Sequence, residues 1–134
     1  MRLLSFLIEA QDIFVPALSE TLIAADFDVT EVTPQPDMHA LLQAKPDAVF
    51  IDLDFVDRDP LEALHIIRTL LPETLLCIST SDPQSGWWRS CRAAGANAVF
   101  SKASTRDEII AGLKYAASSG GFIDHRLDER TRSR

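Results

Sequence analysis

The sequence predicts an α/β protein built on a doubly wound sheet of five parallel strands, with five helices covering its two faces. Three observations predict this fold class. Short apolar segments alternate with segments whose apolar residues recur at helical spacing. Residues 47–52 form a run that is apolar on both faces, which is typical of a central parallel strand covered by helices. Proline or glycine follows three of the helical segments, at Pro72, Gly95 and Gly120.

The expected strands are short and mostly apolar. They comprise residues 3–8, 27–32, 48–52, 74–79 and 98–101. The second of them is more polar than the others, as expected for a strand at the edge of a sheet.

The expected helices comprise residues 12–25, 36–44, 60–71, 85–94 and 105–118. Asp12 is expected to cap the first helix, with Pro16 in its first turn, where a missing N–H costs little. The third helix has apolar residues at helical spacing and ends before Pro72. The last helix is expected to begin at a cap on Ser104 or Thr105.

One domain accounts for most of the chain. Its 134 residues, of which 46% are hydrophobic, suit a single compact unit with a buried core. Residues 1–121 are predicted to form this domain. The apolar pattern is lost from residue 122, so residues 122–134 are predicted to be a linker or a disordered tail.

Charge and composition exclude several classes of function. The net charge is −7, and residues 1–124 carry nine basic against eighteen acidic side chains, which argues against direct binding of nucleic acid. No apolar run approaches the roughly 20 residues of a membrane span, and the apolar start meets Glu9 too early for a signal peptide. Cys77 and Cys91 have no metal-ligand spacing, so we expect reduced thiols in a cytoplasmic protein.

Polar side chains stand where four of the five expected strands end. They are Glu9, Asp52, the pair Ser79 and Thr80, and Lys102. In parallel sheets, ligands and chemistry collect beyond the carboxyl ends of the strands. Two carboxylates, a hydroxyl and an ammonium suit the phosphorylation of an aspartate. One carboxylate is the nucleophile and the other helps to hold a cation such as Mg²⁺, while lysine and hydroxyl bind the oxygens of the product.

With these residues the chain resembles the response-regulator receiver domain, over roughly residues 3–122. The phospho-acceptor block of that family matches residues 47–52, which makes Asp52 the expected acceptor. Its switch hydroxyl matches Ser79, next to Thr80, and its strand-five lysine matches Lys102. The Ala-Ser-Thr that follows this lysine is most similar to receivers of LuxR-type transcriptional regulators. The family has a flavodoxin-like fold.

The resemblance implies a function and partners. A sensor histidine kinase would donate a phosphoryl group to Asp52, and the change would switch a partner or a DNA-binding output. In the LuxR-type subfamily a helix-turn-helix domain follows the receiver, and this chain holds none, so DNA contact is expected only through such a domain. A homodimer is a further expected partner. The domain is expected to be a switch and not an enzyme.

The chain departs from the family pattern at the expected metal site. The family ends its first strand with two adjacent acids, and here the pair is Glu9 and Ala10. Mg²⁺ would then be held by Glu9, by Asp52 and by the backbone carbonyl of Asp54. We therefore expect weak metal binding and slow phosphorylation.

Two residues are expected at an interface formed by the fourth helix and the fifth strand. Adjacent helical residues point about 100° apart, so Trp87 and Trp88 are not both expected to face the core. Trp88 fits the inner stripe. Trp87 is expected either to face outward as an interface anchor or to be partly buried against a neighbouring loop. Val99 stands where the family commonly has an aromatic ring that rotates inward on phosphorylation.

These departures keep a second function open. An atypical receiver would keep the fold and act, without phosphorylation, as a protein interaction or dimerisation module. Asp52 would then be a relic carboxylate. A metal-dependent hydrolase is a more distant alternative, because no histidine joins the predicted site. A nucleotide-binding protein would have a glycine-rich turn after its first strand, and the sequence has none there.

Overall fold

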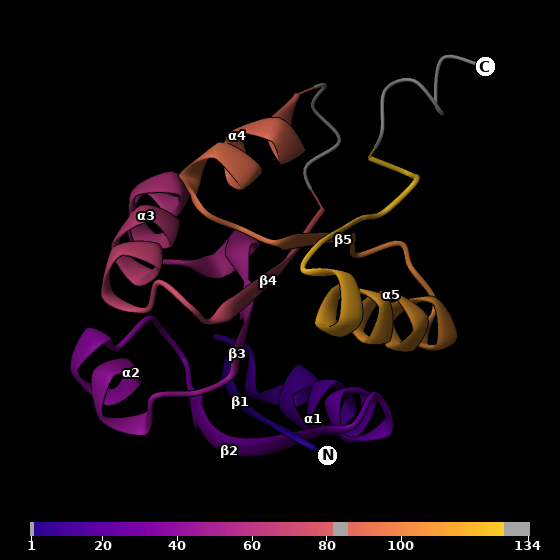
Figure 1. Ribbon diagram of the computed structural model, residues 1–134, viewed down its shortest axis with the longest axis horizontal. Coiled ribbons are helices and arrows are strands. Elements are labelled where there is room, and N and C mark those ends of the chain that lie inside the picture. The colour runs from indigo at the N-terminus through magenta and orange to yellow at the C-terminus, as the bar shows by residue number, and fades with distance from the viewer. Residues whose placement is uncertain (1, 82–85, 128–134) are drawn as a thin grey trace.

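A parallel β-sheet forms the middle layer of the computed structural model, which describes residues 2–81 and 86–127 (Figure 1). Within these residues the sheet has six strands in the order β2-β1-β3-β4-β5-β6. The strands are β1 (Leu3–Ile8), β2 (Phe27–Thr33), β3 (Ala48–Asp52), β4 (Leu75–Thr80), β5 (Ala98–Ser101) and β6 (Phe122–Ile123). All adjacent strands pair in parallel.

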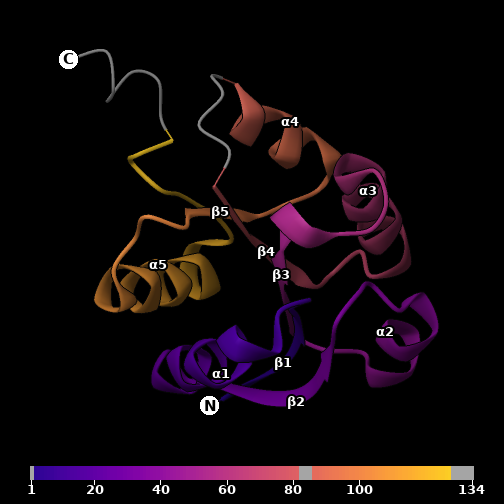
Figure 2. The ribbon, with the colours of Figure 1, turned by 180° about the vertical axis from the view of Figure 1, so that it is seen from behind.

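Helices cover both faces of this sheet. They are α1 (Val15–Ala24), α2 (Met38–Ala44), α3 (Pro60–Leu70), α4 (Trp87–Ala94) and α5 (Arg106–Ser119), with short 3₁₀ turns η1 (Asp12–Phe14) and η2 (Leu53–Phe55). Figures 1 and 2 show α1 and α5 on one face and α2, α3 and α4 on the other. The described residues thus form an α/β fold with a parallel sheet and five α-helices, as the sequence predicts.

The central strand β3 shows why its sequence is apolar throughout. Val49 and Ile51 pack into the core beneath α2, α3 and α4, whereas Ala48 and Phe50 pack into the core beneath α1 and α5. Successive strand residues point to opposite faces, and both faces are covered here, so every residue of β3 is buried. The strand therefore delivers Asp52 to the edge of the sheet from a rigid support.

Side-chain caps fix the starts of three helices. Asp37 accepts a hydrogen bond from the N–H of Ala40 at the start of α2, and Asp59 does the same for two amides of α3. Thr105 and Glu108 form a capping box on α5. The prediction of a cap at Asp12 is wrong, because this residue lies in η1 and α1 begins only at Val15.

The sixth strand is a correction to the predicted five. Phe122 and Ile123 pair with Ala98 and Val99 of β5, and the Phe122 ring stacks on Phe100 at 5.1 Å between centroids. Residues 122–127 therefore belong to the packed body and are not a linker or disordered tail. A strand of two residues is too short to produce a periodic pattern in the sequence. The rest of the predicted tail, residues 128–134, lies outside the described residues.

Room for the Phe122 ring comes from a glycine in α5. A Cβ atom added at Gly112 would lie 2.5 Å from the Phe100 ring and 2.9 Å from the Phe122 ring. The absence of a side chain at this position lets α5 approach β5 and β6 closely.

Both cysteines are free and buried, as the sequence predicts. Burial raises the pKa of the Cys77 thiol to about 12. Across residues 2–81 and 86–127, every helix is too short or too polar to cross a bilayer.

Candidate functional site

Strand register brings the predicted site residues to one edge of the sheet. Asp52 pairs with Ser79 at the end of β3 and β4, and Thr80 pairs with Ser101 at the end of β4 and β5. Glu9 directly follows β1, which is the other neighbour of β3. A cavity of about 420 Å³ opens here between the sheet and helices α1 and α5. Its polar lining residues are Glu9, Thr21, Asp52, Ser79, Ser101, Lys102 and Arg106.

Lys102 bridges two carboxylates at this edge. Its Nζ atom lies 2.7 Å from Oδ1 of Asp52 and 2.9 Å from Oδ2 of Asp54. The Asp52 side chain is 1% exposed and that of Lys102 is 30% exposed. Burial by itself lowers the pKa of Lys102, but the hydrogen bonds to the two carboxylates outweigh it, and the net pKa is raised. The ammonium is therefore charged and partly buried beside Asp52.

Glu9 lies in a different electrostatic state from the other acids. It is only 2% exposed, and this burial raises the pKa of its carboxyl to about 7. A hydrogen bond from the N–H of Gln11 opposes the shift, whereas the neighbouring Asp52 carboxyl adds to it. A bound cation would reduce the repulsion between these two carboxyl groups and favour their ionised forms.

The acids fit a hard cation only weakly. Glu9 and Asp52 supply two carboxylates on one side of the cavity, and Ala10 supplies no ligand. Among residues 2–81 and 86–127, no three or more histidine, cysteine or acidic side chains are grouped so as to hold a metal. The Asp54 side chain is turned away from such a role and engages β4 and Lys102 instead.

The Asp54 carboxylate was not expected among the site's side-chain contacts, because only its backbone carbonyl was assigned a role. Oδ1 accepts hydrogen bonds from the hydroxyl of Thr80 at 3.1 Å and the N–H of Ser81 at 3.2 Å. Oδ2 accepts from the same N–H at 3.0 Å and from Lys102. Burial by itself raises the pKa of Asp54, but the hydrogen bonds from Ser81 and Lys102 outweigh it and lower the net pKa. The only signal in the sequence is a second carboxylate two residues after Asp52.

The two hydroxyls that end β4 lie on opposite sides of the strand. Ser79 lines the cavity with Asp52 and Lys102, whereas Thr80 contacts Asp54 and accepts a hydrogen bond from the indole N–H of Trp87 at 3.3 Å. Alternation of side chains along a strand explains this split. Both predicted hydroxyls thus border the site, and the one that contacts the loop acid is Thr80.

The two predicted interface residues are not exposed. Val99 is 0% exposed and lies in the core beneath α3 and α4. Trp87 is half-buried against the same core, which agrees with the expectation of partial burial and not with a ring that faces fully outward. Side chains of a first helical turn lean toward the helix start, and this direction carries the Trp87 ring back over the end of β4. Trp88 is also half-buried against that core, as predicted.

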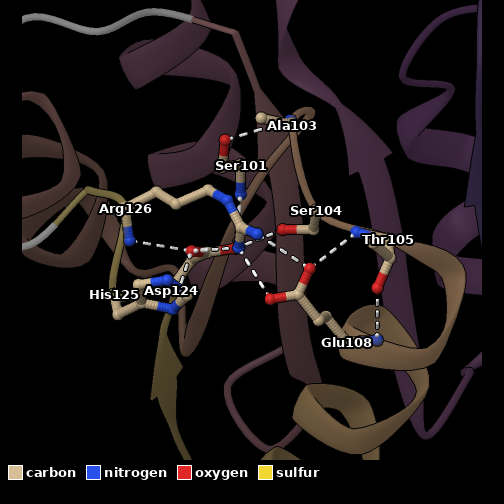
Figure 3. Close-up of polar contacts among 8 residues, drawn as sticks. All are labelled: Ser101, Ala103, Ser104, Thr105, Glu108, Asp124, His125 and Arg126. Atoms are coloured by element: carbon tan, nitrogen blue, oxygen red, sulfur yellow. Dashed lines mark hydrogen bonds and ion pairs between the residues drawn. The ribbon is translucent and has the colours of Figure 1, made fainter.

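A second polar cluster joins the chain after β6 to the loop that carries Lys102 (Figure 3). The buried Asp124 carboxylate accepts hydrogen bonds from the N–H of Ser101, the hydroxyl of Ser104 and the N–H of Arg126. The guanidinium of Arg126 binds both oxygens of Glu108, at 2.8 and 2.9 Å. The bond from Arg126, together with the hydrogen bond from the N–H of Thr105, lowers the pKa of Glu108 to about 2. Sequence reasoning missed the cluster because it placed residues 122–134 in a tail.

Comparisons by sequence and by structure give different results. No family model and no curated protein matches the sequence. Among solved structures, a LuxR-family two-component response regulator from Aurantimonas sp. matches with a TM-score of 0.80 and 19% identity, over 100% of both chains. The isolated receiver domain of RcsB from Salmonella enterica, in the presence of the phosphomimetic BeF₃⁻, matches with a TM-score of 0.82 and 12% identity, over 98% of this chain and 99% of that one.

The same fold also occurs in a protein with a different description. A putative pilus assembly protein, cpaE, from Burkholderia thailandensis matches with a TM-score of 0.72 and 19% identity, over 89% of this chain and 100% of that one. At these identities the likeness concerns the fold, and function has to be argued from the site. The chain has the fold of response-regulator receiver domains, as the resemblance in its sequence predicts.

Proposed function

We propose that the chain is a receiver domain in which Asp52 accepts a phosphoryl group from a histidine kinase. The observation that carries this proposal is the contact between Asp52 and Lys102, 2.7 Å long, at the carboxyl edge of the parallel sheet. A buried carboxylate held by an ammonium, with a hydroxyl and a second acid beside it, suits an acyl phosphate. The phosphorylated domain would alter its binding to a partner or to a DNA-binding output domain.

The residues of the site have distinct roles in this reaction. A carboxylate oxygen of Asp52 attacks the phosphorus, the bond from phosphorus to the donor's histidine nitrogen breaks, and an aspartyl phosphate forms. Lys102 then binds an oxygen of the transferred group, since its ammonium already lies beside Asp52. Bound Mg²⁺ would neutralise phosphoryl oxygens, with Glu9 and Asp52 as its side-chain ligands and the Asp54 carbonyl as a third. The protein catalyses no turnover of a separate substrate in this role.

A second candidate function is favoured by two observations. Ala10 removes a metal ligand, and the Asp54 carboxylate already occupies the hydroxyl of Thr80. Both features suit a domain that signals by docking alone, as a dimer or with another protein. In either function the partners are proteins, and we expect the chain to act in the cytoplasm, where histidine kinases have their catalytic domains.

Intact mass after incubation with acetyl phosphate separates the two functions. The expected result is one phosphoryl increment that requires Mg²⁺ and is lost in Asp52→Asn. In Ala10→Asp the increment should form at lower Mg²⁺ concentrations, because the restored acid adds a ligand. If neither the natural sequence nor Ala10→Asp gains mass over several hours, phosphorylation is not the function and the docking module takes its place.

A further inference from the structure

We infer that the Asp54 carboxylate is a built-in occupant of an oxyanion site formed by Thr80, Ser81 and Lys102. In the unphosphorylated chain it holds the end of β4 and the start of α4 as an oxyanion ligand would. The proposal rests on the proposed function only for the identity of the anion that competes with Asp54 for Lys102, a phosphoryl group on Asp52.

The donors around Asp54 form a complete set for an oxyanion. A hydroxyl, a backbone N–H and an ammonium converge on its two oxygens, at distances between 2.9 and 3.2 Å. Hydrogen bonds from charged or backbone donors to an ionised acceptor are the strong ones in proteins. The same three donor types bind the oxygens of phosphate, so the site has the chemistry of a phosphoryl site.

The site adjoins the proposed acceptor directly. Lys102 touches Asp52 and Asp54 with the same Nζ atom, and the N–H of Asp54 donates to Oδ1 of Asp52 at 3.1 Å. An oxygen attached to Asp52 would therefore compete with the Asp54 carboxylate for the Lys102 ammonium. If it takes this ammonium, Asp54 loses its one charged donor and keeps only Thr80 and Ser81.

The contact continues to helix α4. Thr80 gives its hydroxyl hydrogen to Asp54 and accepts the indole N–H of Trp87, the first residue of α4. The ring of Trp87 packs on the core beneath α3 and α4. The Thr80 hydroxyl thus links the anion at this site to α4. The environment of the Trp87 indole N–H should therefore change when the anion is removed.

Vacating the site tests the inference without any phosphorylation. We compare the natural sequence with Asp54→Ala, and with Asp57→Ala as a matched control. Asp57 lies in the same loop, and within residues 2–81 and 86–127 its side chain has only a long contact with Arg58 at 3.8 Å. The probe is inorganic phosphate, titrated into millimolar concentration. The readouts are the ¹H–¹⁵N resonances of the Ser81 amide and of the Trp87 indole.

The expected result is selective for one variant. In Asp54→Ala both resonances should move from their natural positions and then shift saturably as phosphate fills the vacated site. The variant should bind phosphate at least about tenfold more tightly than the natural sequence, because the ionised competitor is gone. Asp57→Ala should behave like the natural sequence. Asp54→Asn keeps the shape of the side chain and one oxygen acceptor but removes the charge. A gain in phosphate affinity in this variant as well would assign the effect to the charge of Asp54 and not to unfolding.

Two results would overturn the inference. One is an Asp54→Ala variant whose Ser81 and Trp87 resonances stay at their natural positions. The other is equal phosphate affinity in the natural sequence and the variant. Acetyl phosphate then separates this inference from the proposed function: phosphorylation that fails in both chains refutes the acceptor role of Asp52, while the phosphate titration still decides the role of Asp54.

Discussion

At the scale of the residue, the charge balance of the site rests on a single ammonium group facing several acids. Lys102 alone contacts the carboxylates of both Asp52 and Asp54 among the described side chains. Glu9, whose carboxyl neighbours that of Asp52, is not ionised fully at neutral pH because of its burial. A change in charge at any of these positions leaves buried groups unbalanced, and its effect on stability is therefore predictable in sign.

Replacement of the bridging lysine should be costly. Lys102→Met keeps the length of the side chain but leaves Asp52 and Asp54 facing each other without a cation. We expect the free energy of unfolding at neutral pH to fall by about 1–3 kcal/mol, as measured by urea denaturation. Lys114→Met, on the exposed side of α5, is the matched control and should have little effect. Unchanged stability in Lys102→Met would show that the two carboxylates are balanced by other means.

Glu9 should make the protein less stable as the pH rises. Its folded pKa of about 7 lies above 4.5, the ordinary pKa of a glutamate side chain. Folding therefore favours the protonated form. The stability that this provides is fully present below about pH 4.5 and is lost as the pH rises through 7.

Glu9→Gln removes this titration and should be the more stable chain above pH 7. The expected gain at pH 8 is of the order of 2 kcal/mol, measured by urea unfolding at pH 5 and pH 8. Parallel pH profiles for the natural sequence and Glu9→Gln would contradict the raised pKa. The comparison is made without Mg²⁺, because a bound cation would lower the pKa of Glu9.

At the scale of the element, strands and helices were predictable wherever a pattern was long enough to repeat. Strands β1, β3 and β5 have the predicted bounds, and each α-helix has a predicted counterpart. The sheet edge followed from these elements, because parallel strands bring their ends together, and so Glu9, Asp52 and Lys102 were placed correctly. The features that were not predicted depend on local geometry that leaves no repeating pattern of apolar residues in the sequence. The 3₁₀ turn η2 orients the Asp54 side chain, the first turn of α4 directs Trp87, and β6 is only two residues long.

The docking of β6 and the chain after it depends on Arg126. Its guanidinium binds Glu108 of α5 and lies 3.4 Å from Asp124, and the N–H groups of Phe122 and Asp124 donate to β5 and the turn before it. In Arg126→Ala we expect these two amides to exchange hydrogen about tenfold faster or more. Arg106→Ala removes an exposed arginine from the start of the same helix and should leave the exchange unchanged. Equal protection in both variants would mean that the packing of Phe122 holds the segment without the ion pair.

At the scale of the whole molecule, charge limits what the domain can bind by itself. The chain carries 13 basic and 20 acidic residues, and residues 1–124 are more acidic still. Duplex DNA repels such a surface, because affinity for its backbone comes largely from neutralising phosphates with lysine and arginine. Residues 125–134 carry only four arginines against two acids. The domain is therefore expected to affect DNA only through another protein or domain.

This expectation is tested by fluorescence anisotropy with a labelled random-sequence duplex in low salt. We expect binding weaker than about 10⁻⁴ M, which is the weak end of the range of about 10⁻⁴ to 10⁻⁶ M that non-specific DNA binders reach at physiological salt. Low salt makes the test strict, because screening is weakest there and any basic patch is detected most easily. Binding in the micromolar range that weakens steeply with added salt would contradict the expectation. Replacing Arg130, Arg132 and Arg134 by glutamine would then show whether the terminal arginines carry the affinity, since these changes leave Arg126 and its contact with Glu108 intact.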